Sequence, residues 1–131
     1  MTRRTVICES WQVVVVPFPF TDRAATKRRP ALVLSGESFN RHGHTVLAMI
    51  TSAAHGPWPG DTRIEDAKAA GLKAASIVRM KLFTLDNRFI ARQIGALGSN
   101  DRASVTTPLK EFLPLEPDDA PKDESDLTST T

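Results

Sequence analysis

Residues 11–20 are Trp-Gln-Val-Val-Val-Val-Pro-Phe-Pro-Phe, and this stretch decides the fold class of the 131-residue chain. Four consecutive valines favour a β-strand that is buried on both faces. Pro17 and Pro19 end it, because a proline nitrogen cannot donate to a strand ladder. Further short apolar runs, separated by turn residues, predict strands at 30–34, 45–50, 75–80, 82–85 and 91–97. Since no βαβ alternation is present, we expect a mainly β fold, a small antiparallel barrel.

Two helical segments are predicted outside the strands. Glu65 to Ala70 favours one or two helical turns ended by Gly71. A C-terminal helix is expected to begin at Ser99 or Asn100 and to cover the barrel. Its apolar face would hold Val105, Leu109, Phe112 and Leu113. Pro108 interrupts this pattern, so we expect a kink or two short helices there.

The chain divides by composition into three parts. We expect a flexible segment at 1–10, one barrel domain at 11–113 and an acidic, disordered tail at 114–131. The last 19 residues carry six acids and one base, a net charge of −5, which leaves +7 on the remainder of the chain. A body with that excess attracts polyanions, and nucleic acid is the natural partner class. The alternative is that the basic residues only keep the surface soluble.

Several function classes find no support in the sequence. Cys8 is the single cysteine, so internal disulfides and cysteine metal clusters are excluded, which favours a reducing cytoplasm. No membrane span, secretion signal, cofactor motif or nucleophile motif is present, so we expect no cofactor and no membrane partner. His42 and His44 are two residues apart but have no third metal ligand nearby, and His55 is expected at the surface.

RNA cleavage requires neither a metal nor an enzyme nucleophile, because the attacking 2′-hydroxyl belongs to the substrate. The enzyme must align that hydroxyl with the phosphate and donate hydrogen bonds to the charged phosphorane, a task that suits arginine. Arg29 is the best candidate, because Pro30 holds it extended at the start of a strand. Thr51 and Ser52 end the next strand and would place hydroxyls beside it if the two strands are neighbours; the alternative is ordinary strand-end capping.

Residues 21–29 form a polar, basic stretch typical of a surface loop. Arg23, Lys27 and Arg28 would grip an RNA backbone, with Arg28 pointing away from Arg29 because successive extended residues alternate faces. Phe18 and Phe20 would either stack on a base or, as the commoner arrangement, pack in the core.

Five blocks in register carry a resemblance to a known family. They are Val13-Val-Val-Val-Pro-Phe-Pro-Phe-Thr-Asp22, Lys27-Arg-Arg-Pro-Ala-Leu-Val-Leu34, Leu47-Ala-Met-Ile-Thr-Ser52, Ala70-Gly-Leu72 with Ser76-Ile-Val-Arg79, and Lys81-Leu-Phe-Thr-Leu-Asp86. In this order and spacing the chain resembles the PemK/MazF family of type II toxins over about residues 11–113.

The resemblance implies a fold, an activity and partners. It implies an SH3-like barrel with a C-terminal helix, a homodimer, and a sequence-selective, metal-independent endoribonuclease that cuts single-stranded mRNA and arrests growth. It also implies a cognate antitoxin protein, which we expect to have an acidic C-terminal segment. The catalytic pair of the family corresponds to Arg29 and Thr51, and Arg79 matches a further arginine used for catalysis or phosphate contact.

The chain departs from the family pattern at two places. Trp11 and Gln12 stand where many relatives have Gly-Asp, and Lys81 stands where many have an acid two residues after the arginine. The general base is then open: water, Asp86, or no base at all. These departures also keep an alternative function open, a non-catalytic barrel or degenerate toxin that binds nucleic acid or an antitoxin.

Overall fold

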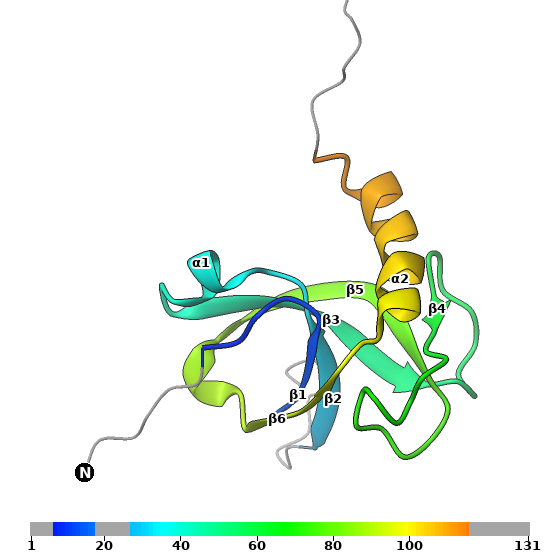
Figure 1. Ribbon diagram of the computed structural model, residues 1–131, viewed down its shortest axis with the longest axis horizontal. Helices are drawn as coiled ribbons and strands as arrows, with labels where there is room; N and C mark the ends of the chain where they lie inside the picture. The colour runs from blue at the N-terminus through cyan, green and yellow to red at the C-terminus, as the bar shows by residue number, and fades with distance from the viewer. Residues whose placement is uncertain (1–6, 18–26, 116–131) are drawn as a thin grey trace, which may run out of the picture.

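The computed structural model describes residues 7–17 and 27–115 as one curled antiparallel sheet with two helices (Figure 1). The strand order is β4-β5-β3-β2-β1-β6. This half-barrel confirms the predicted mainly β fold. The elements in chain order are β1 (Gln12–Pro17), β2 (Arg28–Val33), α1 (Glu37–Asn40), β3 (His44–Ser52), β4 (Thr62–Arg63), β5 (Ser76–Asp86), the 3₁₀ turn Asn87–Phe89, β6 (Arg92–Ala96) and α2 (Ser99–Phe112).

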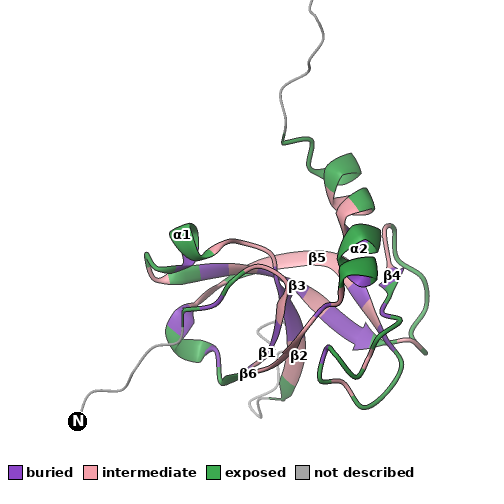
Figure 2. Cartoon of the chain, in the orientation of Figure 1, coloured by how far each residue is buried: buried purple, intermediate pink, exposed green. Residues whose placement is uncertain are grey.

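The sheet is buried on both faces, and each face has its own apolar cluster. Val13 and Val14, adjacent in β1, point to opposite faces and are both fully buried, as the valine run predicts. One cluster, on the face that we call the α2 face, includes Val13, Leu32, Ala48, Ile50, Val78 and Val105 of α2. The other, on the face that we call the Cys8 face, includes Cys8, Val14, Val16, Ala31, Val33 and Leu47. Figure 2 shows this burial concentrated in the central strands.

Cys8 is part of the core of the Cys8 face. Its side chain is fully buried, and its carbonyl accepts a hydrogen bond of 2.8 Å from the amide nitrogen of Asn40. Burial raises the pKa of the Cys8 thiol, since the thiolate would lose its hydration. Core packing therefore begins N-terminal to residue 11, and the thiol is held in its unreactive form, as expected for an inert cysteine.

β5 is one strand of 11 residues, although the sequence predicts two strands that break at Lys81. Ala48 of β3 pairs with Leu82, but the next residue, Met49, pairs with Arg79. Two consecutive residues of β3 therefore pair with residues that are three positions apart in β5. This is a β-bulge, which bends a strand without ending it. The predicted break at Lys81 is therefore the bulge, and it bends the sheet beside Arg79.

The predicted helix at 65–70 is wrong, because these residues form a series of turns. The Asp66 carboxylate accepts the backbone N–H of Ala69 at 3.1 Å, a local bond that competes with helical pairing. Gly71 ends the segment with φ +76°, as its sequence position indicates. The short helix α1 lies in a stretch for which the sequence predicts only a loop.

α2 is a single helix through Pro108, so the expected kink or pair of helices is not formed. Pro108 cannot donate a backbone hydrogen bond within the helix, and close packing of the helix end against Gly60 offsets this loss. The packing is close because a Cβ built on Gly60 would lie 2.7 Å from Phe112 and 3.3 Å from Pro108. The first turn is anchored by the buried Asp101, whose carboxylate accepts the N–H groups of Glu65 and Asp66 at 2.9 and 3.0 Å. Val105 and Leu109 cover the sheet as predicted, whereas Phe112 and Leu113 remain 45% and 38% exposed.

Trp11 adopts a backbone conformation that is unusual for a large residue. Its φ is +75°, a left-handed conformation that favours glycine and costs a larger residue about 1–2 kcal/mol. The strain is offset because the indole packs against the core of the α2 face. The Trp11 backbone also donates to Val33 and accepts from Leu97, at 2.8 and 3.0 Å. These contacts hold the left-handed turn before β1 in place.

None of the helices within residues 7–17 and 27–115 is long and apolar enough to cross a membrane.

We predict that Gly95→Ala destabilises the fold. A Cβ at Gly95 would lie 2.5 Å from the carbonyl oxygen of Ala69, and backbone cannot rotate away as a side chain can. The expected loss is about 1–3 kcal/mol of unfolding free energy in urea titration. Gly56→Ala is the matched control, since its Cβ would meet no atom within 4 Å, and it should change stability by less than about 0.5 kcal/mol. Equal stability of the two variants would contradict the packing described here.

Candidate nucleic-acid interface

The strand registers place Arg29 beside Thr51 on the Cys8 face. β2 and β3 pair Ala31 with Met49 and Val33 with Leu47, and the same register extended by two residues sets Arg29 opposite Thr51. Residues directly opposite in an antiparallel pair share a face, with their Cβ atoms about 5 Å apart. Arg29 is half-buried and Thr51 is 6% exposed. The structure therefore brings together the two groups expected to act on a phosphate.

Thr51 belongs to a row of side chains that crosses five strands. Thr51 pairs with Ile77 of β5, which pairs with Arg63 of β4. On the other side of Arg29, Val16 of β1 is its direct partner. Arg63 is exposed and joins the Cys8 face through the two-residue strand β4, which sequence patterns are too short to reveal. This arginine is a site residue that the sequence analysis missed.

Arg79 lies in the next row on the same face and is engaged by Asp61. Arg79 pairs with Met49 across β5 and β3. Its Nε and Nη2 donate to the two carboxylate oxygens of Asp61 at 3.0 and 2.9 Å. The two side chains are only 11% and 17% exposed. The hydrogen bond to Asp61 and its negative charge raise the pKa of Arg79 above its ordinary value, so Arg79 is a fixed cation whose charge is already balanced.

The β3–β4 loop is held over this cation by further contacts. Arg79 Nη2 also donates to the carbonyl of Gly56 at 2.5 Å, and the backbone N–H of Trp58 donates to the Asp61 carboxylate at 3.1 Å. The indole ring of Trp58 lies 5.6 Å from the Arg79 guanidinium and 5.3 Å from the Lys81 ammonium, both cation–π distances. Trp58 thus gathers two cations at one edge of the interface while remaining 39% exposed.

His55 of the same loop contacts the Thr51 hydroxyl. Its Nδ1 lies 2.7 Å from Thr51 Oγ1, and the residue is exposed. The sequence analysis placed His55 at the surface without a role. The four-residue separation between Thr51 and His55 does not predict a contact, because the contact depends on the tight turn after β3. That turn brings the imidazole ring back onto the strand end. The His55 N–H closes that turn onto the Ser52 carbonyl at 3.2 Å.

Other predicted RNA-binding residues lie away from this pair. Ser52 pairs with Ser76, on the face opposite to Thr51, and its hydroxyl accepts the N–H of Ala54 at 3.1 Å, which is strand-end capping. Arg28 follows the alternation of β2 and is exposed on the face opposite to Arg29, and Lys27 is exposed just before it. Phe18, Phe20 and Arg23 lie outside the described residues.

Asp86 is not positioned to serve as the general base, so that option is corrected. It pairs with His44 at the far end of β3, seven residues along β5 from Arg79 and about 23 Å away for an extended strand. Its carboxylate instead begins the 3₁₀ turn by accepting the Arg88 N–H at 3.0 Å. His44 occupies the same distal end, and the described residues contain no group of three His, Cys, Asp or Glu that would hold a metal.

Comparison with known proteins identifies the family. The sequence model of the PemK-like, MazF-like toxins of type II toxin–antitoxin systems matches residues 9–113. The chain belongs to this family. No curated protein sequence was found to match it.

Solved structures of MazF toxins share the fold of this PemK/MazF-like chain. MazF from Deinococcus radiodurans is 23% identical, with a TM-score of 0.65 over 84% of this chain and 99% of that one. A MazE–MazF complex from the same organism is 25% identical, with a TM-score of 0.66 over 85% and 100% of the two chains. An endoribonuclease in complex with its cognate antitoxin, from a mycobacterial species, is 16% identical, with a TM-score of 0.65 over 83% and 97%.

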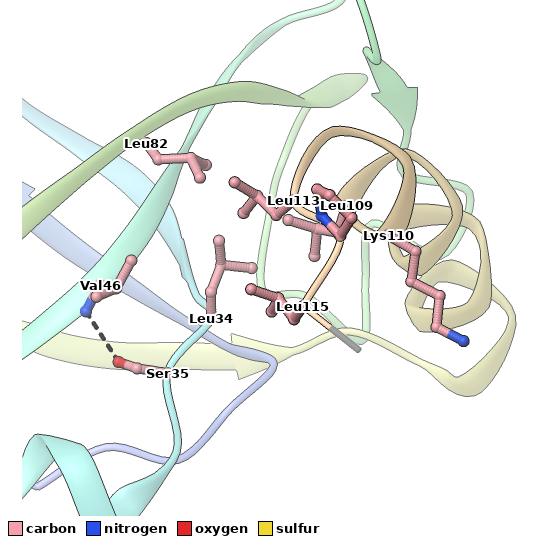
Figure 3. Close-up of a pocket in the computed structure, with 9 residues that line it drawn as sticks. Leu34, Ser35, Val46, Leu82, Leu109, Lys110, Leu113 and Leu115 are labelled. Carbon is pink, nitrogen blue, oxygen red and sulfur yellow. Dashed lines mark hydrogen bonds between the residues drawn. The ribbon is translucent and has the colours of Figure 1, made fainter. Parts of the chain in front are cut away.

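An apolar cleft lies on the opposite side of the sheet of this PemK/MazF-like chain. Figure 3 shows leucines from the sheet and from the end of α2 converging on it. Its volume is about 510 Å³, and Leu34 and Leu82 connect it to the core of the α2 face. Leu115, at its rim, is 84% exposed. The cleft is thus separate from the basic Cys8 face and has a different chemistry.

We predict that Asp61→Ala destabilises the protein by about 3 kcal/mol, because it leaves the largely buried Arg79 without its counter-charge. Thermal or urea unfolding measures the change. Glu37→Ala removes the partner of Arg41 from an ion pair that is 58% and 49% exposed, and it should cost less than about 0.5 kcal/mol. If Asp61→Ala were no more costly than Glu37→Ala, the pair would not hold the β3–β4 loop as described.

Proposed function

We propose that this PemK/MazF-like toxin is an endoribonuclease that cleaves single-stranded mRNA by attack of a 2′-hydroxyl on the adjacent phosphate. The observation that carries the proposal is the register that sets Arg29 opposite Thr51 at the strand ends of a basic face. One solved structural relative is an endoribonuclease in complex with its cognate antitoxin, which supports the same activity class.

In the proposed reaction each group acts on charge that develops at phosphorus. O2′ forms a bond to phosphorus and the bond to O5′ breaks, which leaves a 2′,3′-cyclic phosphate and a 5′-hydroxyl. Arg29 stabilises the phosphorane and protonates the leaving oxygen, and Thr51 donates to a non-bridging oxygen. Arg79, held by Asp61, presents its remaining donors to a neighbouring phosphate.

The remaining basic residues contribute affinity rather than base choice. Arg63 and Lys81 extend the positive charge of the Cys8 face across β4 and β5. Lys27 and Arg28 precede Arg29 and are exposed, so they contact backbone phosphates beyond the cleaved one. Binding should therefore weaken steeply as salt rises. A toxin that cleaves mRNA would act in the cytoplasm, so a cytoplasmic location is part of the proposal.

The protein partners are a cognate antitoxin and a second copy of the chain. An antitoxin segment of acidic character would occupy the basic Cys8 face and exclude RNA from it. Support comes from the MazE–MazF complex among the structural relatives. A second copy would cover the apolar cleft, because the exposed Leu113 and Leu115 line it, and such patches on soluble proteins are typically interfaces.

We predict that Arg29→Ala lowers cleavage of a single-stranded RNA at least about 100-fold, because one phosphorane-stabilising cation is lost. The measurement is product formation in the presence of a chelator, with detection of 2′,3′-cyclic phosphate ends, beside growth arrest on induction in bacteria. Arg41→Ala, an exposed arginine after α1, is the matched control and should cleave as the wild type does. RNA binding without cleavage by the wild type would favour a degenerate, non-catalytic toxin.

We also predict that Leu113→Asp converts the dimer to a monomer in light scattering coupled to size exclusion, because a carboxylate at the cleft would lose its hydration on association. Phe39→Asp, a similarly exposed apolar residue on α1, should leave the dimer intact. A dimer that persists in the Leu113 variant would place the interface elsewhere.

A further inference from the structure

We infer that His55 is a further catalytic residue, the general base that takes the proton from the 2′-hydroxyl; the inference rests on the proposed ribonuclease function. The starting observation is the 2.7 Å contact between His55 Nδ1 and Thr51 Oγ1. It concerns the residue set opposite Arg29, so the imidazole stands at the pair on which the proposed chemistry depends.

Within residues 7–17 and 27–115, the other candidates for accepting this proton do not fit the role. Lys81, two residues after Arg79, is a cation, and Asp86 lies at the far end of β5. Asp61 is close but has both carboxylate oxygens engaged by Arg79 and the Trp58 N–H. Imidazole is the side chain best suited to accept a proton near neutral pH.

The contact with Thr51 fixes the ring for this role. When Nδ1–H donates to Thr51 Oγ1, the lone pair at Nε2 is directed away from the hydroxyl and is able to accept a proton. The Thr51 hydroxyl keeps its own hydrogen for a non-bridging phosphate oxygen. One threonine thus orients the base and binds the phosphate, which explains why a hydroxyl at a nearly buried position contacts an exposed ring.

The proton balance of the step is complete. Nε2 takes the proton of the 2′-hydroxyl as O2′ bonds to phosphorus, which gives an imidazolium. The leaving O5′ takes its proton from the Arg29 guanidinium, and the guanidinium is reprotonated by solvent. The imidazolium releases its proton to solvent after the products leave. No metal, oxidant or further reactant is required.

The base must be neutral to act, so cleavage should fall as pH is lowered through the range in which imidazole protonates. The charged groups on the surrounding elements are the same in a His55 variant, so loss of the pH dependence in that variant assigns it to the imidazole. These groups are Arg29 of β2, Arg63 of β4, Arg79 and Lys81 of β5, and Asp61 of the β3–β4 loop.

The test compares His55→Gln with His42→Gln, an exposed histidine at the opposite end of β3. Cleavage of a single-stranded RNA and RNA binding are both measured from pH 5 to pH 9. His55→Gln should lower kcat at least about 100-fold, flatten the acidic limb of the pH profile and leave RNA affinity within about threefold of wild type. His42→Gln should match the wild type.

Thr51→Ser and Thr51→Val separate a chemical from a structural role. The serine variant keeps the hydroxyl and should retain the acidic limb, whereas the valine variant should lose it together with most of the activity. If His55→Gln cleaves at the wild-type rate with the same pH profile, the inference fails while the ribonuclease function stands. If the wild type binds RNA but does not cleave it, both the proposed function and the inference are overturned.

Discussion

The register between β2 and β3 is the constraint on which the rest of this structure depends. Ala31, Leu32 and Val33 alternate between two buried faces, so a slip of one residue would exchange the contents of both apolar clusters. The packing of three small and medium apolar side chains therefore determines which way Arg29 points. The β2–β3 ladder ends at Ala31 and Met49, beside Pro30, which has no N–H to donate, and the polar pair lies just beyond.

Two of the cations on the Cys8 face are held in place by contacts with the β3–β4 loop. Asp61 balances Arg79, and Trp58 lies against both Arg79 and Lys81, so one loop holds two cations. Buried pairing of this kind adds little net stability but fixes geometry. In the proposed function, the exposed cations Lys27, Arg28 and Arg63 attract the RNA. One set of residues thus fixes the geometry of this face, and another set would attract the RNA.

The two faces of the sheet offer surfaces of different chemistry. The Cys8 face ends in cations and hydroxyls, whereas the α2 face ends in an apolar cleft bordered by leucines. Since a strand alternates its side chains, each of the central strands contributes to both surfaces at once. The apolar cleft and the basic face are therefore separate surfaces of one small domain.

The amino-acid pattern was enough to predict most of the strands, the C-terminal helix and the double-sided burial of the valines, because alternation and proline positions act locally. It left the pairing of Arg29 with Thr51 conditional on their two strands being neighbours, which the β2–β3 register decides. It failed for residues 65–70, for Pro108 and for the bulge at Lys81, where side-chain capping and packing outweigh local preference. The left-handed Trp11, the approach of Asp61 to Arg79 and the contact of His55 with Thr51 arise from long-range packing and loop closure. These contacts join groups from separate turns and strands, so only the folded chain could reveal them.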